Sequence, residues 1–257
     1  TDVLVTGNIY GYGMPATITD YDSDNYVTIT CKGGDLTLNK VGPNAGKIGT
    51  TTSDTVFLEF SIAAAADITI KRTRLVFCLD ADGSGVYEAA SSSAGADIED
   101  IKIKDKDSGA IIAGPKDGTA FNDGVYAGCP GSIAGEYEDF TDTIDLTAGT
   151  TKTYQVSADI KTSNTDSGME IAASSRIKFI LYSYATLVGT SGTVNYIKYA
   201  GTSDAVDDSA IVPSGDIAGE EMTVESASLA ITLAASPGGT SKTYIKGQAG
   251  VETVGLI

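Results

Sequence analysis

Short stretches in which apolar and polar residues alternate recur along the chain, and they constrain its fold more than any other feature. A period of two places successive side chains on opposite faces of a β-strand. The clearest stretches are Asp54–Ile62, Asp67–Leu79, Ile98–Lys104, Lys152–Lys161, Arg176–Val188 and Thr193–Ala200. In the first of them, Phe57 is predicted to face away from Leu58 and Phe60. No long segment has the 3.6-residue period of a helix, so the sequence predicts an all-β fold.

Turn-forming clusters separate these stretches and favour antiparallel pairing. They are rich in Gly, Asp, Asn and Ser, as in GPNAGKIG, DADGSG, DKDSG, AGPKDG, FNDG and SNTDSG. Strands joined by such turns pair with their neighbours, and two sheets built in this way can pack face to face. We therefore expect an antiparallel β-sandwich, immunoglobulin-like or jelly-roll-like, with long loop insertions such as Gly114–Gly135.

A weak internal repeat in the sequence separates the expected domain from its two ends. Gly33–Ile62 and Ala227–Ile257 each contain an alternating strand, a turn with Gly and Pro, and a second apolar strand. Serial repetition of one unit is how extended arrays are built. The repeat predicts a main β-sandwich domain at residues 34–225. An N-terminal segment or the end of another unit precedes it at residues 1–33. Residues 226–257 then open a next unit or are donated to a neighbour, and folding back onto the main domain is the alternative.

The charge balance restricts the partners of this chain. Its formal net charge is −17, from 34 acidic and 17 basic residues. A phosphate backbone repels such a surface, so nucleic acid is not an expected partner. No run approaches the roughly 18 apolar residues of a membrane helix, so membrane insertion is not expected either. Solubility and the binding of cations such as calcium both explain the acidity.

Common catalytic constellations are missing from the sequence. The chain contains no histidine, which removes Ser-His-Asp and Cys-His nucleophiles and HExxH zinc sites. It also contains none of the patterns GxxxxGK[ST], GxGxxG and GxSxG. We therefore expect no enzymatic activity. A hydrolase that uses two carboxylates alone is a third functional hypothesis, because such an enzyme needs no histidine.

The segment DADGSGVYE, Asp80–Glu88, has the spacing of an EF-hand-type calcium loop. Calcium takes several oxygen ligands, and this spacing supplies them at alternate positions around a turn that contains Gly. The predicted ligands are Asp80, Asp82, Ser84, the backbone carbonyl of Val86, and Glu88. Ser91 stands where such loops usually have a bidentate glutamate. An Asp- and Gly-rich hairpin turn is the alternative explanation.

Further acidic clusters also offer oxygen ligands for a cation. In DYDSDNY, Asp20, Asp22 and Asp24 alternate, and three carboxylates so close together repel one another unless a cation is present. This is the second candidate calcium site, and a solvated acidic linker explains it equally well. Asp105 and Asp107 in DKDSG are predicted to belong to an ordinary polar turn.

Three cysteines, Cys31, Cys78 and Cys129, lie far apart in the sequence. The chain has no CxxC pair, which excludes zinc ribbons and thioredoxin-type redox chemistry. One disulfide would leave one free thiol, and the sequence does not choose the pair.

Two segments resemble the tandem immunoglobulin-like domains of prokaryotic S-layer proteins, adhesins and cell-surface fibres. They are the C-terminal stretch SLAITLAASPGGTSKTYIKGQAGVETVGLI and the similar segment Asp35–Ile62. The resemblance implies extracellular, cell-surface work with copies of itself or neighbouring repeats as partners. We therefore expect a calcium-stabilised structural subunit or repeat of a filament, stalk or S-layer, with strand donation as one route of self-assembly. The alternative is an adhesin or carbohydrate-binding β-sandwich module whose tyrosines contact a cell-surface or glycan ligand.

Overall fold

The computed structural model describes residues 35–87, 97–121, 124–129, 135–161, 171–189 and 196–226, together with the backbone of four short N-terminal strands. Those strands form two-stranded sheets, β1 (Val5–Thr6) with β2 (Gly13–Met14) and β3 (Ala16–Ile18) with β4 (Ile29–Cys31). The chain divides into two units, residues 1–227 and 228–257. The second unit lies outside the described residues, and with it almost all of the predicted C-terminal strands.

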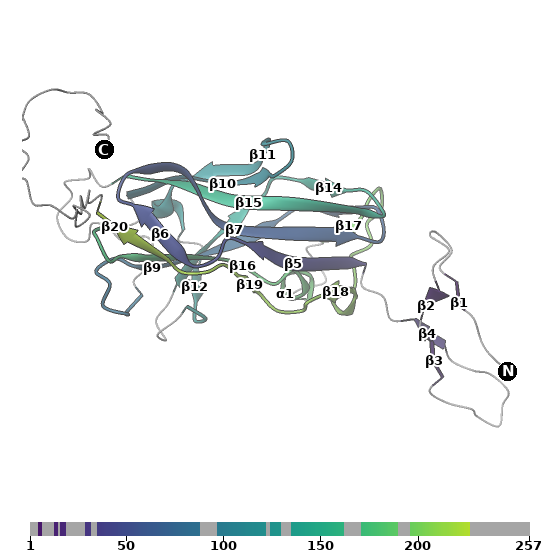
Figure 1. The fold of residues 1–257 in the computed structure, drawn as a ribbon. Coiled ribbons are helices and arrows are strands. Elements are labelled where there is room, and N and C mark those ends of the chain that lie inside the picture. Colours follow the sequence, from purple (N-terminus) through teal and green to yellow (C-terminus); the bar gives the residue numbers. More distant parts are fainter. Residues whose placement is uncertain are drawn as a thin grey trace, which may run out of the picture. The chain divides into compact units, whose positions relative to one another are not determined.

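The first large sheet has six strands in the order β11-β10-β15-β7-β5-β18. These strands are β5 (Leu36–Gly42), β7 (Thr52–Ala64), β10 (Ile98–Asp105), β11 (Ile111–Lys116), β15 (Thr150–Ile160) and β18 (Ile211–Val212). The central pair, β7 and β15, are the longest strands, and they lie antiparallel along most of their length (Figure 1).

The second large sheet has seven strands, six of them in the order β12-β13-β9-β16-β20-β6, and β19 also pairs with β16. These strands are β6 (Gly46–Gly49), β9 (Thr73–Asp80), β12 (Gly124–Tyr126), β13 (Gly135–Phe140), β16 (Arg176–Leu181), β19 (Ile217–Ala218) and β20 (Met222–Glu225). A small third sheet contains β8 (Ile68–Ile70), β14 (Ile144–Leu146) and β17 (Ile197–Tyr199).

The all-β prediction is confirmed for the described residues, whose one α-helix is the six-residue α1 (Tyr184–Gly189). Two single-turn 3-10 helices, η2 (Gly118–Ala120) and η3 (Asp208–Ala210), accompany it. The prediction of purely antiparallel sheets is wrong at two edges, because β18 pairs with β5 and β20 pairs with β6 in parallel. Both sheets are therefore mixed. No described helix is long and apolar enough to cross a membrane.

Side chains of both large sheets meet in one apolar core. Phe57 of β7 lies 5.3 Å from Phe179 of β16, measured between ring centroids, and Phe179 stacks on Phe77 of β9 at 5.0 Å. Phe121, which follows η2, packs edge-on against Phe77 and Phe140. The aromatic cluster spans the two sheets and fixes their separation, because rings of this size prefer tilted or offset contacts.

The second large sheet is buried on both of its faces along β9. Leu75, Phe77 and Leu79 belong to the main core. Val76 and Cys78, which alternate with them, belong to a second apolar cluster with Tyr87, Cys129 and Ile180. This double burial explains why the run RLVFCL is almost continuously apolar, since a strand with both faces covered needs no polar face.

A β-bulge overturns the predicted orientation of Phe57. Phe57 is fully buried, like Leu58 and Phe60, instead of facing away from them. The register of β15 against β7 shifts between the pairs Val156–Leu58 and Ser157–Val56, so Phe57 is an extra residue without a partner of its own. Such an insertion re-aims a side chain, which here adds a phenyl ring to the core.

Two of the predicted strands contain breaks that the prediction missed. Asp67–Leu79 divides into β8 and β9, which belong to different sheets. Arg176–Val188 ends as a strand at Leu181, and α1 follows. Ser183 caps this helix, since its hydroxyl accepts a hydrogen bond from the backbone N–H of Thr186 at 3.0 Å. The predicted insertion Gly114–Gly135 likewise contains η2 and β12.

Candidate functional site

The loop after β9 surrounds the carboxylate of Asp80, the first predicted calcium ligand. Asp80 is fully buried. Its Oδ2 accepts a hydrogen bond from the backbone N–H of Gly85 at 2.9 Å, and Nε of Arg176 lies 3.9 Å from the same oxygen. Its Oδ1 has no hydrogen-bond partner among the described residues. The loop thus donates a hydrogen bond to one carboxylate oxygen of Asp80, whereas the other oxygen accepts none from the described residues.

The next predicted ligands, Asp82, Ser84 and Val86, lie in the same loop. Oδ1 of Asp82 accepts a hydrogen bond from the backbone N–H of Ser84 at 2.9 Å, and Oγ of Ser84 accepts one from Val86 at 3.2 Å. The Ser84 contacts lower the pKa of Asp82, so this carboxyl group is ionised at neutral pH. Glu88 lies outside the described residues, so the described part of the site contains two carboxylates.

Two glycines shape this loop. Gly83 and Gly85 have φ angles of +71° and +86°, a conformation that residues with a Cβ rarely adopt. A Cβ atom added at Gly83 would lie 2.6 Å from the carbonyl oxygen of Ser174. The loop therefore packs directly against the chain just before β16. In the described residues no group of three or more His, Cys, Asp or Glu side chains is placed to hold a metal.

The other predicted sites have separate outcomes. Asp20, Asp22 and Asp24 lie outside the described residues. Asp105 and Asp107 form a turn at the end of β10, in which Oδ1 of Asp105 accepts hydrogen bonds from the backbone N–H groups of Asp107 and Ser108.

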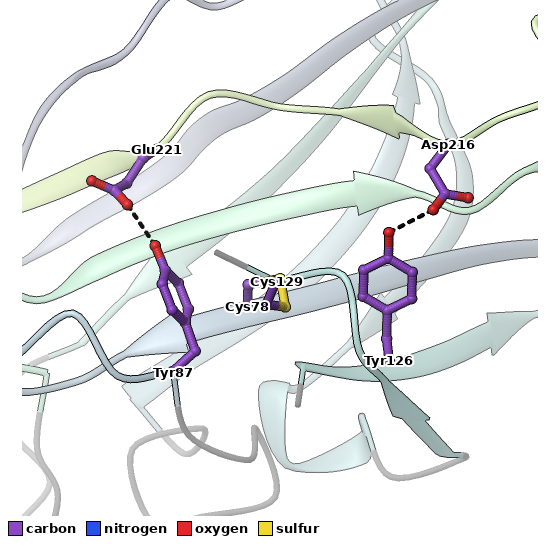
Figure 2. Close-up of a disulfide and its surroundings, with 6 residues drawn as sticks. All are labelled: Cys78, Tyr87, Tyr126, Cys129, Asp216 and Glu221. Atoms are coloured by element: carbon purple, nitrogen blue, oxygen red, sulfur yellow. Dashed lines mark hydrogen bonds between the residues drawn. A yellow bond between two sulfur atoms is a disulfide. The ribbon is translucent and has the colours of Figure 1, made fainter. Parts of the chain in front are cut away.

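The disulfide joins Cys78 of β9 to Cys129, with their Cα atoms 5.8 Å apart. The side chain of Cys31 is not described. Figure 2 shows Tyr87 and Tyr126 on either side of the disulfide, each with its hydroxyl directed at a carboxylate. Tyr87 donates a hydrogen bond to Glu221, and Tyr126 donates one to Asp216, both at 2.5 Å.

The environment of these two tyrosines suppresses their ionisation. Burial raises the pKa of both hydroxyls, and the adjacent carboxylates Glu221 and Asp216 raise it further. The hydroxyls are therefore protonated hydrogen-bond donors at physiological pH. They hold residues 87 and 126 against the stretch 216–221, across the disulfide-bearing face of the second sheet.

A pocket of about 540 Å³ opens beside Tyr126. Its polar and aromatic lining includes Arg74, Tyr126, Tyr137, Tyr182, Ser183 and Asp216. The guanidinium of Arg74 lies 3.8 Å from the centroid of the Tyr137 ring and makes two hydrogen bonds to Asp139. Among the described residues of this lining, Asp216 is the one carboxylate, whereas a glycosidase uses a pair of acids.

A second pocket of about 440 Å³ lies along the outer edge of β5. Leu38 of β5 lines one side, and Val212, Pro213, Ile217 and Ala218 contribute the other apolar surface. Val212 is 48% exposed, whereas Leu38 and Ile217 are buried at the base. The pocket is therefore a mainly apolar groove, with Lys40 and Asp216 also in its lining, between the edge of the first sheet and the chain that leads to β19.

Comparison with known proteins does not assign this chain to a family. No family model matches this chain, and no curated protein matches it either. Among solved structures, AvmM, which catalyses macrocyclization in alchivemycin A biosynthesis, matches 85% of this chain and 100% of its own. The identity is 7% and the TM-score is 0.38, a likeness too low to support an argument about function.

Proposed function

We propose that this chain is a non-catalytic structural subunit of an extracellular microbial surface assembly, and that its copies join by strand addition. Its two large sheets are proposed to form a β-sandwich of the immunoglobulin-like or jelly-roll-like kind. The observation that supports the proposal is an open sheet edge, the outer side of β5 beyond Thr37, next to an apolar groove. An edge of this kind is a template for another strand.

The neighbouring strand β18 covers only the beginning of β5. Ile211 pairs with Leu36 and Val212 with Thr37, and the ladder then stops. No described residue forms a ladder with the outer side of Leu38–Gly42. Because β5 continues for five more residues that pair with no described strand on this side, an incoming strand can add there, beside a groove that accepts apolar side chains and next to the ion pair of Lys40 with Glu220.

The opposite edge of the same sheet is protected. Strand β11 contains Gly114, with a φ of +91°, and Pro115, which has no N–H to donate. Its pairing with β10 is also irregular, with register shifts near Ile103. Bulges and proline are devices that keep sheet edges from pairing with other chains. The contrast favours β5 as the edge that accepts a strand.

We propose residues 226–257 of a second copy as the strand donor. This segment contains the alternating stretch Leu229–Leu233, and a short hairpin is marginally stable by itself in water. It carries two lysines and one glutamate, a net charge of +1, whereas residues 1–225 carry −18, which together give the chain's net charge of −17. Opposite charge favours the encounter of donor and acceptor. A head-to-tail contact that does not close on itself gives a filament.

The disulfide supports the extracellular part of the proposal. Cys78 and Cys129 are buried and joined, and structural disulfides are common in secreted proteins and rare in reducing compartments. The outside of the cell or the cell surface is therefore the proposed location.

Deletion of residues 226–257 tests strand donation. We expect the full chain to form concentration-dependent oligomers and the truncated chain to remain a folded monomer, as measured by light scattering and circular dichroism. Folding back predicts the reverse, an unfolded truncated chain and a monomeric full chain.

A pair of point variants sharpens the test. Val212→Asp places a charge in the groove at an exposed position, so it should block assembly without unfolding the domain. Ile111→Asp is the matched control, because Ile111 is similarly exposed, at 52% against 48% for Val212, but lies on the protected edge β11. Equal assembly of both variants would contradict β5 as the acceptor.

A carbohydrate-binding module is the second candidate function. The pocket beside Tyr126 supports it, since Tyr126, Tyr137 and Tyr182 present rings there and aromatic faces stack on sugars. Saturable binding to a glycan panel that is lost on Tyr182→Ala would favour this candidate over the structural one.

A further inference from the structure

We propose that the loop Asp80–Val86 binds a calcium ion and that Oδ1 of Asp80 is its central ligand. The proposal goes beyond strand assembly, because the loop and the β5 groove share no residue. It depends on one observation that the sequence spacing cannot supply, the missing partner of a buried carboxylate oxygen.

The turn after β10 shows what a self-sufficient acidic turn looks like in this protein. Asp105 is also buried at the end of a strand. Its Oδ1 accepts hydrogen bonds from the backbone N–H of Asp107 and from both the N–H and the hydroxyl of Ser108. Nζ of Lys152 lies 3.5 Å from its Oδ2. Both carboxylate oxygens of Asp105 therefore have polar partners, and this turn needs no ion.

The loop after β9 is built in the same way but is incomplete. Oδ2 of Asp80 has the Gly85 amide and the nearby Arg176, whereas Oδ1 has no partner among the described residues. A buried polar atom without a hydrogen bond is costly, and more so when it carries charge. A cation at Oδ1 removes that cost. The fixed position of Oδ2 also directs Oδ1 away from the Gly85 amide.

The remaining oxygens of the loop suit calcium. The carboxylate of Asp82 is exposed, Oγ of Ser84 keeps a lone pair beyond the one that accepts from Val86, and the backbone carbonyl of Val86 follows two residues later in the sequence. These are hard oxygen ligands, and water completes the six to eight that Ca²⁺ takes. Mg²⁺ demands a stricter octahedron and dehydrates reluctantly, so it fits a loop of this kind less well.

The position of the loop means that an ion there would stabilise the whole domain. Asp80 pairs with Arg176 in the β9–β16 ladder, and Arg176 pairs with Thr223 of β20. Gly83 packs on Ser174, and Tyr87 hydrogen-bonds to Glu221. A calcium ion would therefore fix a loop that follows β9 and contacts β16 and the residues just before β16 and β20, and unfolding would release it.

Thermal or urea unfolding of the full chain in calcium and in EDTA tests the proposal. Extracellular sites bind calcium with a Kd of about 10⁻⁴–10⁻³ M. At roughly 10 mM calcium, a site of that affinity raises the ratio of folded to unfolded protein about 10- to 100-fold. We expect a higher unfolding midpoint in calcium and a much smaller effect of magnesium. Identical curves in calcium and EDTA, or an equal effect of magnesium, would overturn the proposal.

Single substitutions show which residues are responsible for the stabilisation by calcium. Asp82→Asn removes a ligand at an exposed position, so the domain should fold and lose most of its calcium response. Asp80→Asn keeps an acceptor for Gly85 but replaces one carboxylate oxygen with an amide nitrogen that cannot bind a cation, so it should lose the calcium response. Asp107→Asn in the self-sufficient turn is the matched control and should keep the full response.

Terbium luminescence gives a readout that does not depend on stability. The chain has no tryptophan, and Tyr87 lies at the end of the loop, so it can sensitise bound Tb³⁺. We expect emission that calcium displaces, that Asp82→Asn abolishes and that Asp107→Asn leaves unchanged. Emission that persists in Asp82→Asn would show that the ion binds elsewhere.

Discussion

At the scale of single residues, Asp54 shows how one acidic side chain organises neighbouring strands. It lies in β7 with a φ of +55°, and its carboxylate contacts Lys102 and Lys104 of β10 and Ser157 of β15. These contacts, with the hydrogen bond from Lys104 the largest, lower its pKa from 3.8 to about 2. The side chain is 53% exposed, so solvent screening reduces the stabilisation to about 0.5–1 kcal/mol.

This pKa predicts a specific dependence of stability on acid. A carboxyl group with a lowered pKa in the folded state stabilises the fold above its unfolded pKa, and the contribution disappears as pH falls from 3.8 towards about 2. Asp54→Asn retains the left-handed backbone, which asparagine tolerates. We expect the two proteins to differ by about 0.5–1 kcal/mol near neutral pH and to converge in acid, as measured by urea unfolding. A difference that is constant with pH would contradict this role.

Residue-level sites were only partly predictable from the sequence. The spacing of Asp80, Asp82 and Ser84 indicated one loop, because these residues are adjacent in the chain and a Gly-containing turn brings them together. The hydrogen bond between Tyr126 and Asp216 joins residues 90 positions apart. Nothing local in the sequence marks such a pair, since only the arrangement of strands brings it together.

At the scale of elements, the disulfide attaches the segment after β12 to the central part of the second sheet. It closes a loop with a sequence separation of 51 residues, and both sulfur-bearing side chains are buried against Val76 and Tyr87. The segment that contains Cys129 has little other regular structure in the described residues. The disulfide therefore reduces the conformational entropy of the unfolded chain. In the folded chain it holds the segment of Cys129 against the second apolar cluster.

The disulfide should contribute strongly to stability. For a loop of this length, the chain-entropy relation gives about 4 kcal/mol. We expect the double variant Cys78→Ser and Cys129→Ser to lower the free energy of unfolding by about 2–5 kcal/mol, with no further loss on adding a reductant. Cys31→Ser is the control, and it should keep the full sensitivity to reductant. If Cys31→Ser lost that sensitivity instead, the pairing would be wrong.

Regular alternation predicted the long strands well, and it failed where the chain changes sheet or structure type. Ile98–Lys104 and Lys152–Lys161 coincide closely with β10 and β15, whose polar and buried residues alternate along most of each strand. The break between β8 and β9 falls within the polar run Lys71–Arg74, across which one continuous strand was predicted. The start of α1 was also missed, since Tyr184 and Leu187 lie three residues apart and only the Ser183 cap marks a helix.

At the scale of the whole molecule, the decisive question is where residues 226–257 pair. Donation to a neighbour, continuation into a next unit and folding back differ in one measurable respect, the protection of the outer edge of β5. Residues 38–42 share no ladder on that side with any described residue, whereas β7 lies between two partners in the middle of its sheet. Hydrogen exchange of their backbone amides therefore distinguishes the three arrangements.

Strand donation predicts protection that depends on concentration. Amides of β5 that point away from β7 should exchange rapidly in dilute protein and slowly under assembling conditions, because only an added strand supplies their acceptors. Amides of β7 should be protected in both conditions and serve as the internal control. Folding back predicts slow exchange at β5 even in dilute monomer, and continuation into a next unit predicts fast exchange at every concentration. Protection that appears with concentration on β11 instead would move the contact to the other edge of the sheet and contradict the proposed acceptor.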